Sequence, residues 1–157
     1  MAGGRPIDAR GWIFEVEDED AGAEKWLPIS GITSWTHSPG ENEETVDTTA
    51  FDSGGQYEQD IMQRGATLEI EGQYRIDKTT KAQDPGQAYI DHVWAQRLGI
   101  DSRNRVRWRH QTQTKWVVWD ATCTPGEQSG GTNDKTSWSV TVTRCGPAAV
   151  ADVVATP

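Results

Sequence analysis

The chain has 157 residues and a formal net charge of −9, from 24 acidic and 15 basic side chains. A chain of this length buries about two thirds of its unfolded surface, so a single domain with one core is expected. The acidic balance argues against a surface that holds nucleic acid by neutralising phosphates. No stretch approaches the ~18 consecutive apolar residues of a membrane span, and the first residues lack the apolar segment of a signal peptide. The composition therefore predicts no membrane association.

The first ten residues show no sustained hydrophobic period, which predicts an N-terminal arm over residues 1–10. A single domain over residues 11–146 follows. It begins with "GWIFEVEDE", where Trp12, Phe14 and Val16 alternate with polar residues, the pattern of a half-buried strand. "KWLPISGITSW" is also β-like, and its proline places it at a sheet edge or a bend.

Residues 38–64 are polar and weakly patterned, which predicts a long loop. They precede the clearest strand, "ATLEIEGQYRI", in which every second residue is apolar or aromatic up to its end. The inward face of that strand is predicted to hold Ala66, Leu68, Ile70, Tyr74 and Ile76.

One helix is predicted over about residues 85–98. Asp84 stands at the N-cap position, Pro85 at the first helical position and Gln87 where a capping-box partner belongs. Gly99 then suits the left-handed residue that ends a helix. The buried stripe of the helix is predicted to contain Ile90, Val93, Trp94 and Leu98.

Three more strands are predicted in "NRVRWRH", "KWVVWDATC" and "TSWSVTVTR". The last residues lack a period and predict a C-terminal arm over residues 147–157. Strands on both sides of one helix indicate a mainly β protein with one helix, a β-sandwich or open β-barrel flanked by the α-helix.

No arrangement of residues predicts catalysis. His37, His92 and His110 fall on a loop, a helix and a strand, and none has a second ligand at metal-binding spacing. The sequence also lacks a nucleophile elbow, a phosphate-binding loop and a zinc motif. We therefore expect a protein that is not an enzyme and that needs no metal or cofactor.

Two features allow a binding function. Alternate arginines over residues 103–109 suit a nucleic-acid stripe, or a row that pairs with acidic residues such as Glu69 and Glu71. Eight tryptophans, of which Trp35 and Trp116 are the least clearly buried, suit the sugar-stacking platform of a carbohydrate-binding module. Pairing with acidic residues is the simpler interpretation of the alternate arginines.

A loop of this length in a compact domain is usually functional or disordered. Its scattered apolar residues, including Val46, Phe51 and Tyr57, suit a segment that becomes ordered against another chain. The sequence therefore indicates a subunit of an assembly.

Three stretches carry a resemblance: "GITSWTHSPGENEETVDTTAFDSGGQYEQDIMQRGATLEIEGQYRID", "DPGQAY" and "GGTNDKTSWSVTVTRCG". Over roughly residues 31–146 the chain resembles the major tail proteins, or tail tube proteins, of long-tailed, siphovirus-type phages of actinobacteria. The resemblance implies a β-sandwich or barrel with a flanking helix that forms hexameric rings, stacked head to tail into a hollow tube for DNA ejection.

In that family the segment between two long strands bridges rings, so residues 38–64 would be the inter-subunit and ring-stacking loop. The candidate contact residues are Thr45, Val46, Asp47, Thr48, Thr49, Phe51, Asp52 and Tyr57. A lumen lined by carboxylates would keep passing DNA from adhering. The candidate lumen residues, chosen from strand parity alone, are Glu15, Glu17, Glu69 and Glu71.

The implied partners are further copies of the chain, the tape-measure protein, the tail terminator, and baseplate or distal tail proteins. Double-stranded DNA would pass through the tube without specific binding. The protein would be assembled in the host cytoplasm and would reside in the virion tail. Two alternatives stay open: a baseplate or head-completion protein that forms a single ring, and a monomeric carbohydrate-binding module.

Overall fold

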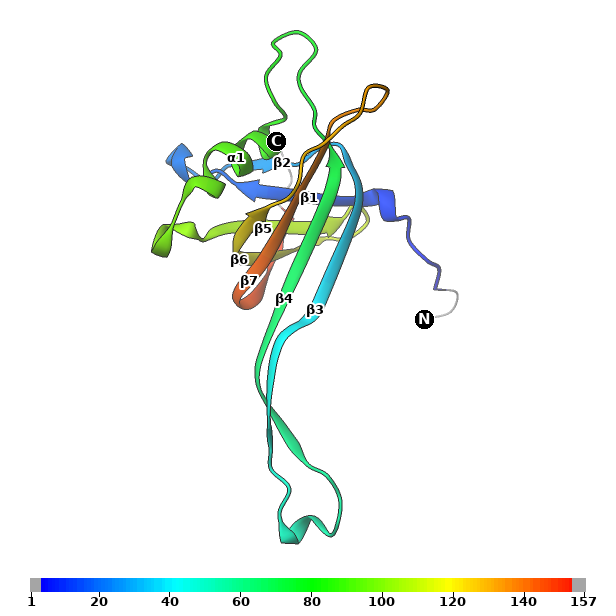
Figure 1. Cartoon of the computed structure of the whole chain (residues 1–157), viewed down its shortest axis with the longest axis vertical. Coiled ribbons are helices and arrows are strands. Elements are labelled where there is room, and N and C mark those ends of the chain that lie inside the picture. Colours follow the sequence, from blue (N-terminus) through cyan, green and yellow to red (C-terminus); the bar gives the residue numbers. More distant parts are fainter. Residues whose placement is uncertain (1–3, 154–157) are drawn as a thin grey trace.

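The computed structural model describes residues 4–153 as one antiparallel sheet of seven strands with a single α-helix (Figure 1). The strands are β1 (Trp12–Glu17), β2 (Trp26–Pro28), β3 (Ile32–Asp47), β4 (Gln59–Gln73), β5 (Asn104–His110), β6 (Lys115–Pro125) and β7 (Ser137–Asp152). Their order in the sheet is β2-β1-β5-β6-β7-β4-β3. The prediction of a mainly β fold with one helix is confirmed.

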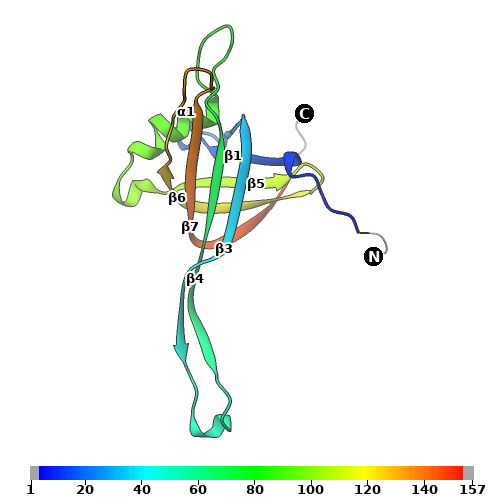
Figure 2. The ribbon, with the colours of Figure 1, turned by 45° about the vertical axis from the view of Figure 1, so that its right-hand side comes forward.

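The sheet folds over on itself, so that β1 and β5 cross β3, β4 and β7 at a steep angle (Figures 1 and 2). The long strands β6 and β7 belong to both layers, and their pairing shifts register between Val118 and Asp120. A register shift of this kind lets a strand bend where the sheet turns. The result is an open, barrel-like sandwich whose two layers share one core.

The core is built by the strand faces that the alternation predicts. Phe14 and Val16 of β1 and Trp108 of β5 are buried, and Leu68 and Ile70 of β4 face them from the other layer. Tyr74 is only half-buried, and Ile76 is 54% exposed because β4 ends before it, at Gln73. The predicted inward face is therefore correct as far as the strand extends and wrong for Ile76.

The helix α1 spans Pro85–His92 and is shorter than predicted. Asp84 caps it by accepting a hydrogen bond from the backbone N–H of Gln87 at 3.3 Å. After Val93 the chain continues in two 3₁₀ turns, Trp94–Gln96 and Gly99–Ser102. Ile90 and Trp94 are buried as predicted, whereas Leu98 is 85% exposed, so its place in the buried stripe is wrong.

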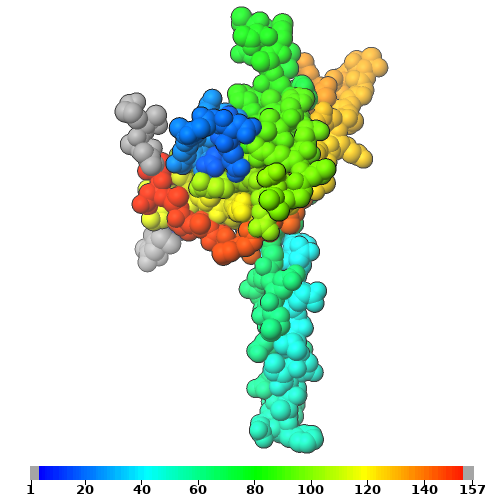
Figure 3. Space-filling model, turned by 90° about the vertical axis from the view of Figure 1, so that its left-hand side faces the viewer, coloured from blue at the N-terminus to red at the C-terminus, as the bar shows by residue number. Residues whose placement is uncertain are grey.

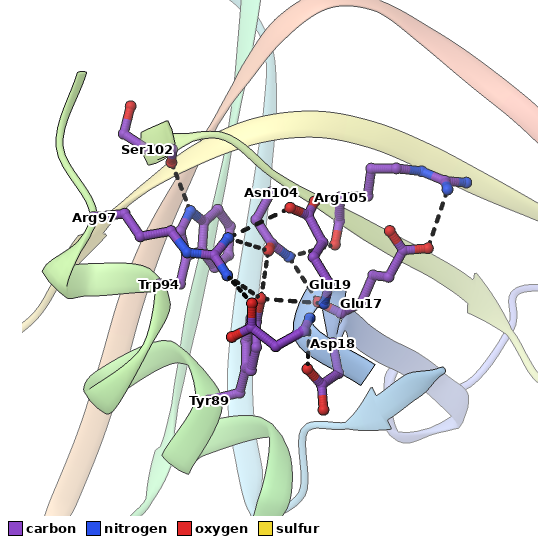
Figure 4. Close-up of polar contacts among 10 residues, drawn as sticks. Glu17, Asp18, Glu19, Tyr89, Trp94, Arg97, Ser102, Asn104 and Arg105 are labelled. Atoms are coloured by element: carbon purple, nitrogen blue, oxygen red, sulfur yellow. Dashed lines mark hydrogen bonds and ion pairs between the residues drawn. The ribbon is translucent and has the colours of Figure 1, made fainter. Parts of the chain in front are cut away.

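Tertiary contacts explain the early end of the helix (Figure 4). The indole N–H of Trp94 donates to the carbonyl of Ser102 at 2.8 Å. Arg97 donates to the Tyr89 hydroxyl at 3.1 Å and to Asn104 Oδ1 at 3.2 Å, and it reaches Glu19 at 3.4 Å. These bonds fix the segment after α1 in a tight turn, and they outweigh the local helical preference of the sequence.

Gln87 has a different role from the predicted capping-box partner, because its side chain is fully buried. Its amide accepts from the backbone N–H of Arg75 at 3.2 Å and donates to the carbonyls of Ser30 at 3.0 Å and Gln73 at 2.8 Å. The side chain therefore ties the start of α1 to the ends of two strands.

We expect Gln87→Leu to destabilise the fold by about 3 kcal/mol, because it removes three partly buried hydrogen bonds to the backbone while keeping similar volume. Chemical denaturation followed by tryptophan fluorescence measures the loss. Gln96→Leu is the control, since Gln96 is exposed and makes one bond, at 3.3 Å, to the carbonyl of Asp91. Equal effects of the two substitutions would contradict this role for Gln87.

The termini differ from the predicted arms in one respect. Residues 147–152 of the predicted C-terminal arm form the end of β7 and pair with β6, where Val150 lies opposite Val117. On the N-terminal side, Ala9–Gly11 forms a 3₁₀ turn, and the ring of His110 lies 2.9 Å from the carbonyl of Asp8. The remainder of both predicted arms, residues 1–3 and 154–157, lies outside the described residues.

Among residues 4–153, none of the helices has both the length and the apolar character of a membrane span.

Candidate assembly interface

Residues 38–64, predicted as a loop, form the outer part of a long β-hairpin (Figure 1). Strands β3 and β4 pair from Ile32 and Gly72 as far as Asp47 and Gln59, with several register shifts along β3. The outer hairpin stands away from the body as a narrow column (Figure 3). The loop prediction was wrong because neither face of the outer hairpin is covered, so the sequence lacks the apolar alternation that marks a half-buried strand.

The tip of the hairpin is ordered by its own hydrogen bonds. The backbone N–H of Thr48 donates to the carbonyl of Glu58 at 3.0 Å, and the N–H of Glu58 donates to the Thr49 hydroxyl at 2.9 Å. The Ser53 hydroxyl donates to the Glu58 carboxylate at 2.7 Å. Asp47 accepts from the N–H of Thr49 at 2.9 Å. The tip therefore has a defined shape before it meets a partner.

The outer hairpin exposes large apolar side chains. Half of the ten exposed large hydrophobic residues among those described lie on it: Val46, Phe51, Tyr57, Ile61 and Met62. Phe51 is 104% exposed, and Tyr57 and Met62 are close to 70% exposed. Apolar surface concentrated on a projecting element marks an interaction site. An isolated two-stranded hairpin is also only marginally stable in water, which favours a partner in the assembled state.

All eight candidate contact residues from the sequence are exposed, and the structure brings them together at the far end of this hairpin. Ile61 and Met62, two of the scattered apolar residues that the sequence offered for contact with another chain, are exposed on the same hairpin. Strand pairing places Ile61 opposite Thr45.

The outer hairpin also concentrates negative charge. Residues 38–64 contain seven acidic side chains and one arginine, so six of the nine net negative charges lie there. That arginine, Arg64, pairs with Glu43 at 3.1 Å across the hairpin. The exposed apolar side chains therefore stand in a strongly acidic setting.

The outer face of β3, β4 and β7 is hydrophilic and carries no basic side chain among its paired positions. Glu69 and Glu71 lie exposed on this face, and the Ser34 hydroxyl donates to Glu71 at 3.1 Å. The residues opposite Glu69 and Glu71 on adjacent strands are Ser34, Thr36, Ser139 and Thr141. The same face continues with Ser38 and Thr143, which lie opposite Thr67, and with Thr122 and Thr124 on β6. We call this surface the Ser/Thr/Glu face.

The outer face of β1 and β5 is different, because its acidic residues pair with the arginine row. Glu15 lies 2.6 Å from Arg107, and Glu17 lies 3.0 Å from Arg105. Burial raises the pKa of Glu17, although the charge of Arg105 opposes this effect. The arginine row therefore pairs with acidic residues, as predicted, but its partners are Glu15 and Glu17 on β1 and not Glu69 and Glu71. Glu69 and Glu71 are on β4, which lies between β3 and β7 and so is not a neighbour of β5.

Tryptophans complete this second face. The Arg107 guanidinium lies 4.2 Å from the ring of Trp26 and 4.1 Å from that of Trp116, and Arg109 lies 4.8 Å from Trp116. Trp116 is buried, and the half-buried Trp35 packs into the core cluster with its ring 5.1 Å from Trp12. Neither tryptophan offers the open platform that a sugar-binding module needs.

The histidines have structural partners. His110 is buried and its ring lies 2.8 Å from the Thr112 hydroxyl, and His92 lies 3.0 Å from the Gln83 amide oxygen. Burial among the core tryptophans, with a smaller effect from Arg144, lowers the pKa of His37. Within residues 4–153 no three His, Cys, Asp or Glu side chains are grouped as metal ligands.

No protein-family model matches the sequence, and no curated protein does. Solved structures match the fold across nearly the whole chain. One is from the tail of an empty gene transfer agent particle, refined helically with C6 symmetry; its TM-score is 0.67 at 16% identity, covering 92% of this chain and 98% of that one. The chain shares its fold with a chain of that tail.

Two further structures agree with this assignment of the fold. A chain from the virion of a native gene transfer agent particle matches with a TM-score of 0.61 at 16% identity, over 95% of this chain and 100% of that one. A chain from the sheath-tube complex of an extracellular contractile injection system, PVC, in its extended state matches with a TM-score of 0.53 at 15% identity, over 94% and 93%. The same fold thus recurs in chains of different particles.

Proposed function

We propose that the chain is a structural subunit of a tail tube, which self-assembles into stacked rings that form a conduit for DNA ejection. The observation that carries the proposal is the tail-tube fold over nearly the full length of both chains, combined with a projecting hairpin of exposed apolar residues. The C6 symmetry of the matched gene transfer agent tail supports six subunits per ring. Such a role is structural and needs no catalytic centre.

Free strand edges suit the formation of a ring. Strand β3 ends the sheet, so one side of its residues 32–38 has no strand partner. At the other side of the same layer, residues 122–125 of β6 pair with β7 alone, because β5 pairs with β6 only over residues 117–121. A neighbour's strand would satisfy both edges, and contacts between two different edges form a ring when the rotation between neighbours closes.

We infer that the Ser/Thr/Glu face lines the lumen. Glu69 and Glu71 would repel the DNA backbone there, and the absence of basic side chains on its paired positions would prevent adhesion. Glu15 and Glu17 lie on the opposite face, where arginines partly neutralise them, so we leave them out of the proposed lumen.

The double substitution Glu69→Lys and Glu71→Lys is expected to leave tube assembly intact and to slow genome ejection, because cationic side chains would hold the passing phosphates. Ejection is measured on particles complemented with the variant. The control, Asp101→Lys with Asp134→Lys, changes the net charge equally at exposed positions outside this face. Loss of tubes would instead assign Glu69 and Glu71 to a subunit interface.

The wider setting follows from this proposal. We infer a place in a virion tail assembled in the host cytoplasm, with a tape-measure protein inside the tube and a terminator and baseplate or distal tail proteins at its ends. Kinship with the major tail proteins of siphovirus-type phages of actinobacteria is part of the same proposal.

Negative-stain electron microscopy of the concentrated protein tests the proposal. Long hollow tubes with a regular axial repeat and six-fold end views are the expected result. Single rings that never stack would favour a baseplate or head-completion protein. A monomer whose tryptophan fluorescence is quenched by glycans would favour a carbohydrate-binding module and overturn the tube.

A further inference from the structure

The two ends of the long axis differ in shape and in charge (Figures 1 and 2). One end is the acidic hairpin tip with its exposed apolar residues. At the other end the loop of residues 75–84, between β4 and α1, reaches furthest, and the loop of residues 126–136 beside it reaches less far. Stacking along this axis would bring the hairpin end of one copy to the loop end of another.

The 75–84 loop presents basic side chains. Lys78 and Lys81 are exposed, and neither has an ion-pair partner within residues 4–153. Arg75 is exposed at the base of the loop, and Ile76 adds an apolar side chain that is 54% exposed. The loop thus combines positive charge with apolar surface, the complement of the hairpin tip.

The acidic residues of this loop are used within it. The Asp77 carboxylate accepts from the backbone N–H groups of Thr79 and Thr80, both at 2.8 Å, and these bonds lower its pKa. The Asp84 carboxylate caps α1 and accepts from the N–H of Ser30 at 3.2 Å. Both carboxylates accept from backbone donors, whereas Lys78 and Lys81 have no ion-pair partner among the described residues.

The loop is also closed and ordered. The backbone N–H of Asp77 donates to the carbonyl of Ala82 at 2.7 Å, and the N–H of Lys81 donates to the carbonyl of Asp77 at 2.9 Å. The backbone of Lys81 is in the left-handed conformation, with a φ of 63°. A preformed loop loses little conformational entropy when a partner binds.

We propose that the acidic hairpin tip of one copy docks on the Lys78 and Lys81 loop of the next copy along the tube. This inference rests on the proposed tube and names the surface that receives the hairpin. Phe51 and neighbouring apolar residues would meet the apolar part of the loop, and Asp52 and Asp60 would face the two ammonium groups.

Other basic surfaces are less suitable for this contact. Arg105 and Arg107 are already paired with glutamates, and Lys115 is paired with Asp152. Lys135 is the one basic residue of its loop, against two acidic residues, Glu127 and Asp134, whereas the 75–84 loop has three basic and two acidic residues. The 75–84 loop is therefore the best match in charge at the end opposite the hairpin.

The arrangement also sets the polarity of stacking. Two hairpin ends placed together would oppose two clusters of carboxylates, and like charges placed opposite one another suppress such a pairing. A hairpin end on a loop end instead brings opposite charges together. All rings would then point the same way, and added salt would weaken the stacking because the charges are near the surface.

Charge reversal and its rescue test the proposal. We expect Lys78→Glu with Lys81→Glu, and separately Asp52→Lys with Asp60→Lys, to raise the protein concentration needed for tube formation by about tenfold. All four substitutions in one chain should restore assembly, because the two surfaces again carry opposite charges. Lys25→Glu with Lys135→Glu is the control with the same change in net charge at exposed lysines.

Pelleting and electron microscopy give the readout, and circular dichroism checks that each variant is folded. If the wild type forms tubes and both double variants do so at the same concentration, the docking surface is wrong although the tube stands. Double variants that fail without rescue by the four-fold variant would also overturn it. A wild-type chain that never self-associates would overturn the tube itself.

Discussion

Replacing residues 46–60 by an Asn-Gly turn is expected to give a stable, folded protein that no longer forms tubes. The deletion removes the tip and the last ladder pairs, and leaves Thr45 opposite Ile61 as the closing pair. No buried residue is lost, because all deleted residues are exposed except the half-buried Ser53. An Asn-Gly turn suits the twist of a two-residue hairpin connection. Sedimentation velocity and electron microscopy measure the loss of assembly.

The melting temperature and near-UV circular dichroism separate assembly from folding in this experiment, and both should match those of the wild-type monomer. Phe51→Ser with Met62→Ser is the matched variant, since it keeps the hairpin and removes two of its exposed apolar side chains. It should weaken assembly without changing the fold. A truncated chain that unfolds would show that the hairpin supports the core, and one that still forms tubes would exclude the hairpin from stacking.

Most of the fold could be predicted from the sequence because most strands are buried on one face only. Each strand with one covered face, such as β1 or β5, shows the alternation that the core imposes. The outer hairpin has no covered face, so its residues follow solubility and the requirements of a partner, and no period marks them as strands. Its apolar residues nevertheless indicated a contact surface, because exposed side chains such as Phe51 have no use within one copy.

The rest of the fold could not be predicted because it depends on contacts between residues far apart in the sequence. Strand parity placed Glu15, Glu17, Glu69 and Glu71 on outward faces, but parity cannot tell which strands are neighbours. The order β1-β5 gives the arginine row to Glu15 and Glu17 and leaves the other pair exposed. The end of α1 was missed for a related reason, since the bonds of Arg97 come from residues distant in sequence, including Glu19.

The aromatic cluster closes the open side of the sandwich. Strands β1 and β3 are not hydrogen-bonded to each other, yet the rings of Trp12 and Trp35 lie 5.1 Å apart across this seam. Trp108 lies behind them and contacts three strands: its ring is 5.5 Å from Trp12, 4.9 Å from His37 and 5.9 Å from Trp119. Side-chain packing here replaces the backbone ladder that would close a complete barrel.

We therefore expect Trp108→Ala to destabilise the protein by about 4 kcal/mol, the usual cost of removing a buried tryptophan, and to lower the melting temperature by roughly 10 °C. Trp108→Phe should cost about 1–2 kcal/mol, because it keeps an aromatic ring and removes a buried indole N–H. That N–H has no hydrogen-bond partner among the described residues. Thermal and chemical denaturation of the unassembled protein measure both values.

Trp26→Ala is the control, because Trp26 is half-buried on the outer face and stacks on Arg107. Its loss should cost about 1 kcal/mol, the order of a partly exposed cation–π contact. If Trp108→Ala costs no more than this control, the seam does not depend on the aromatic cluster. If Trp108→Phe costs as much as the alanine variant, the shape of the indole is what closes the seam, since the phenyl ring retains most of the apolar contact.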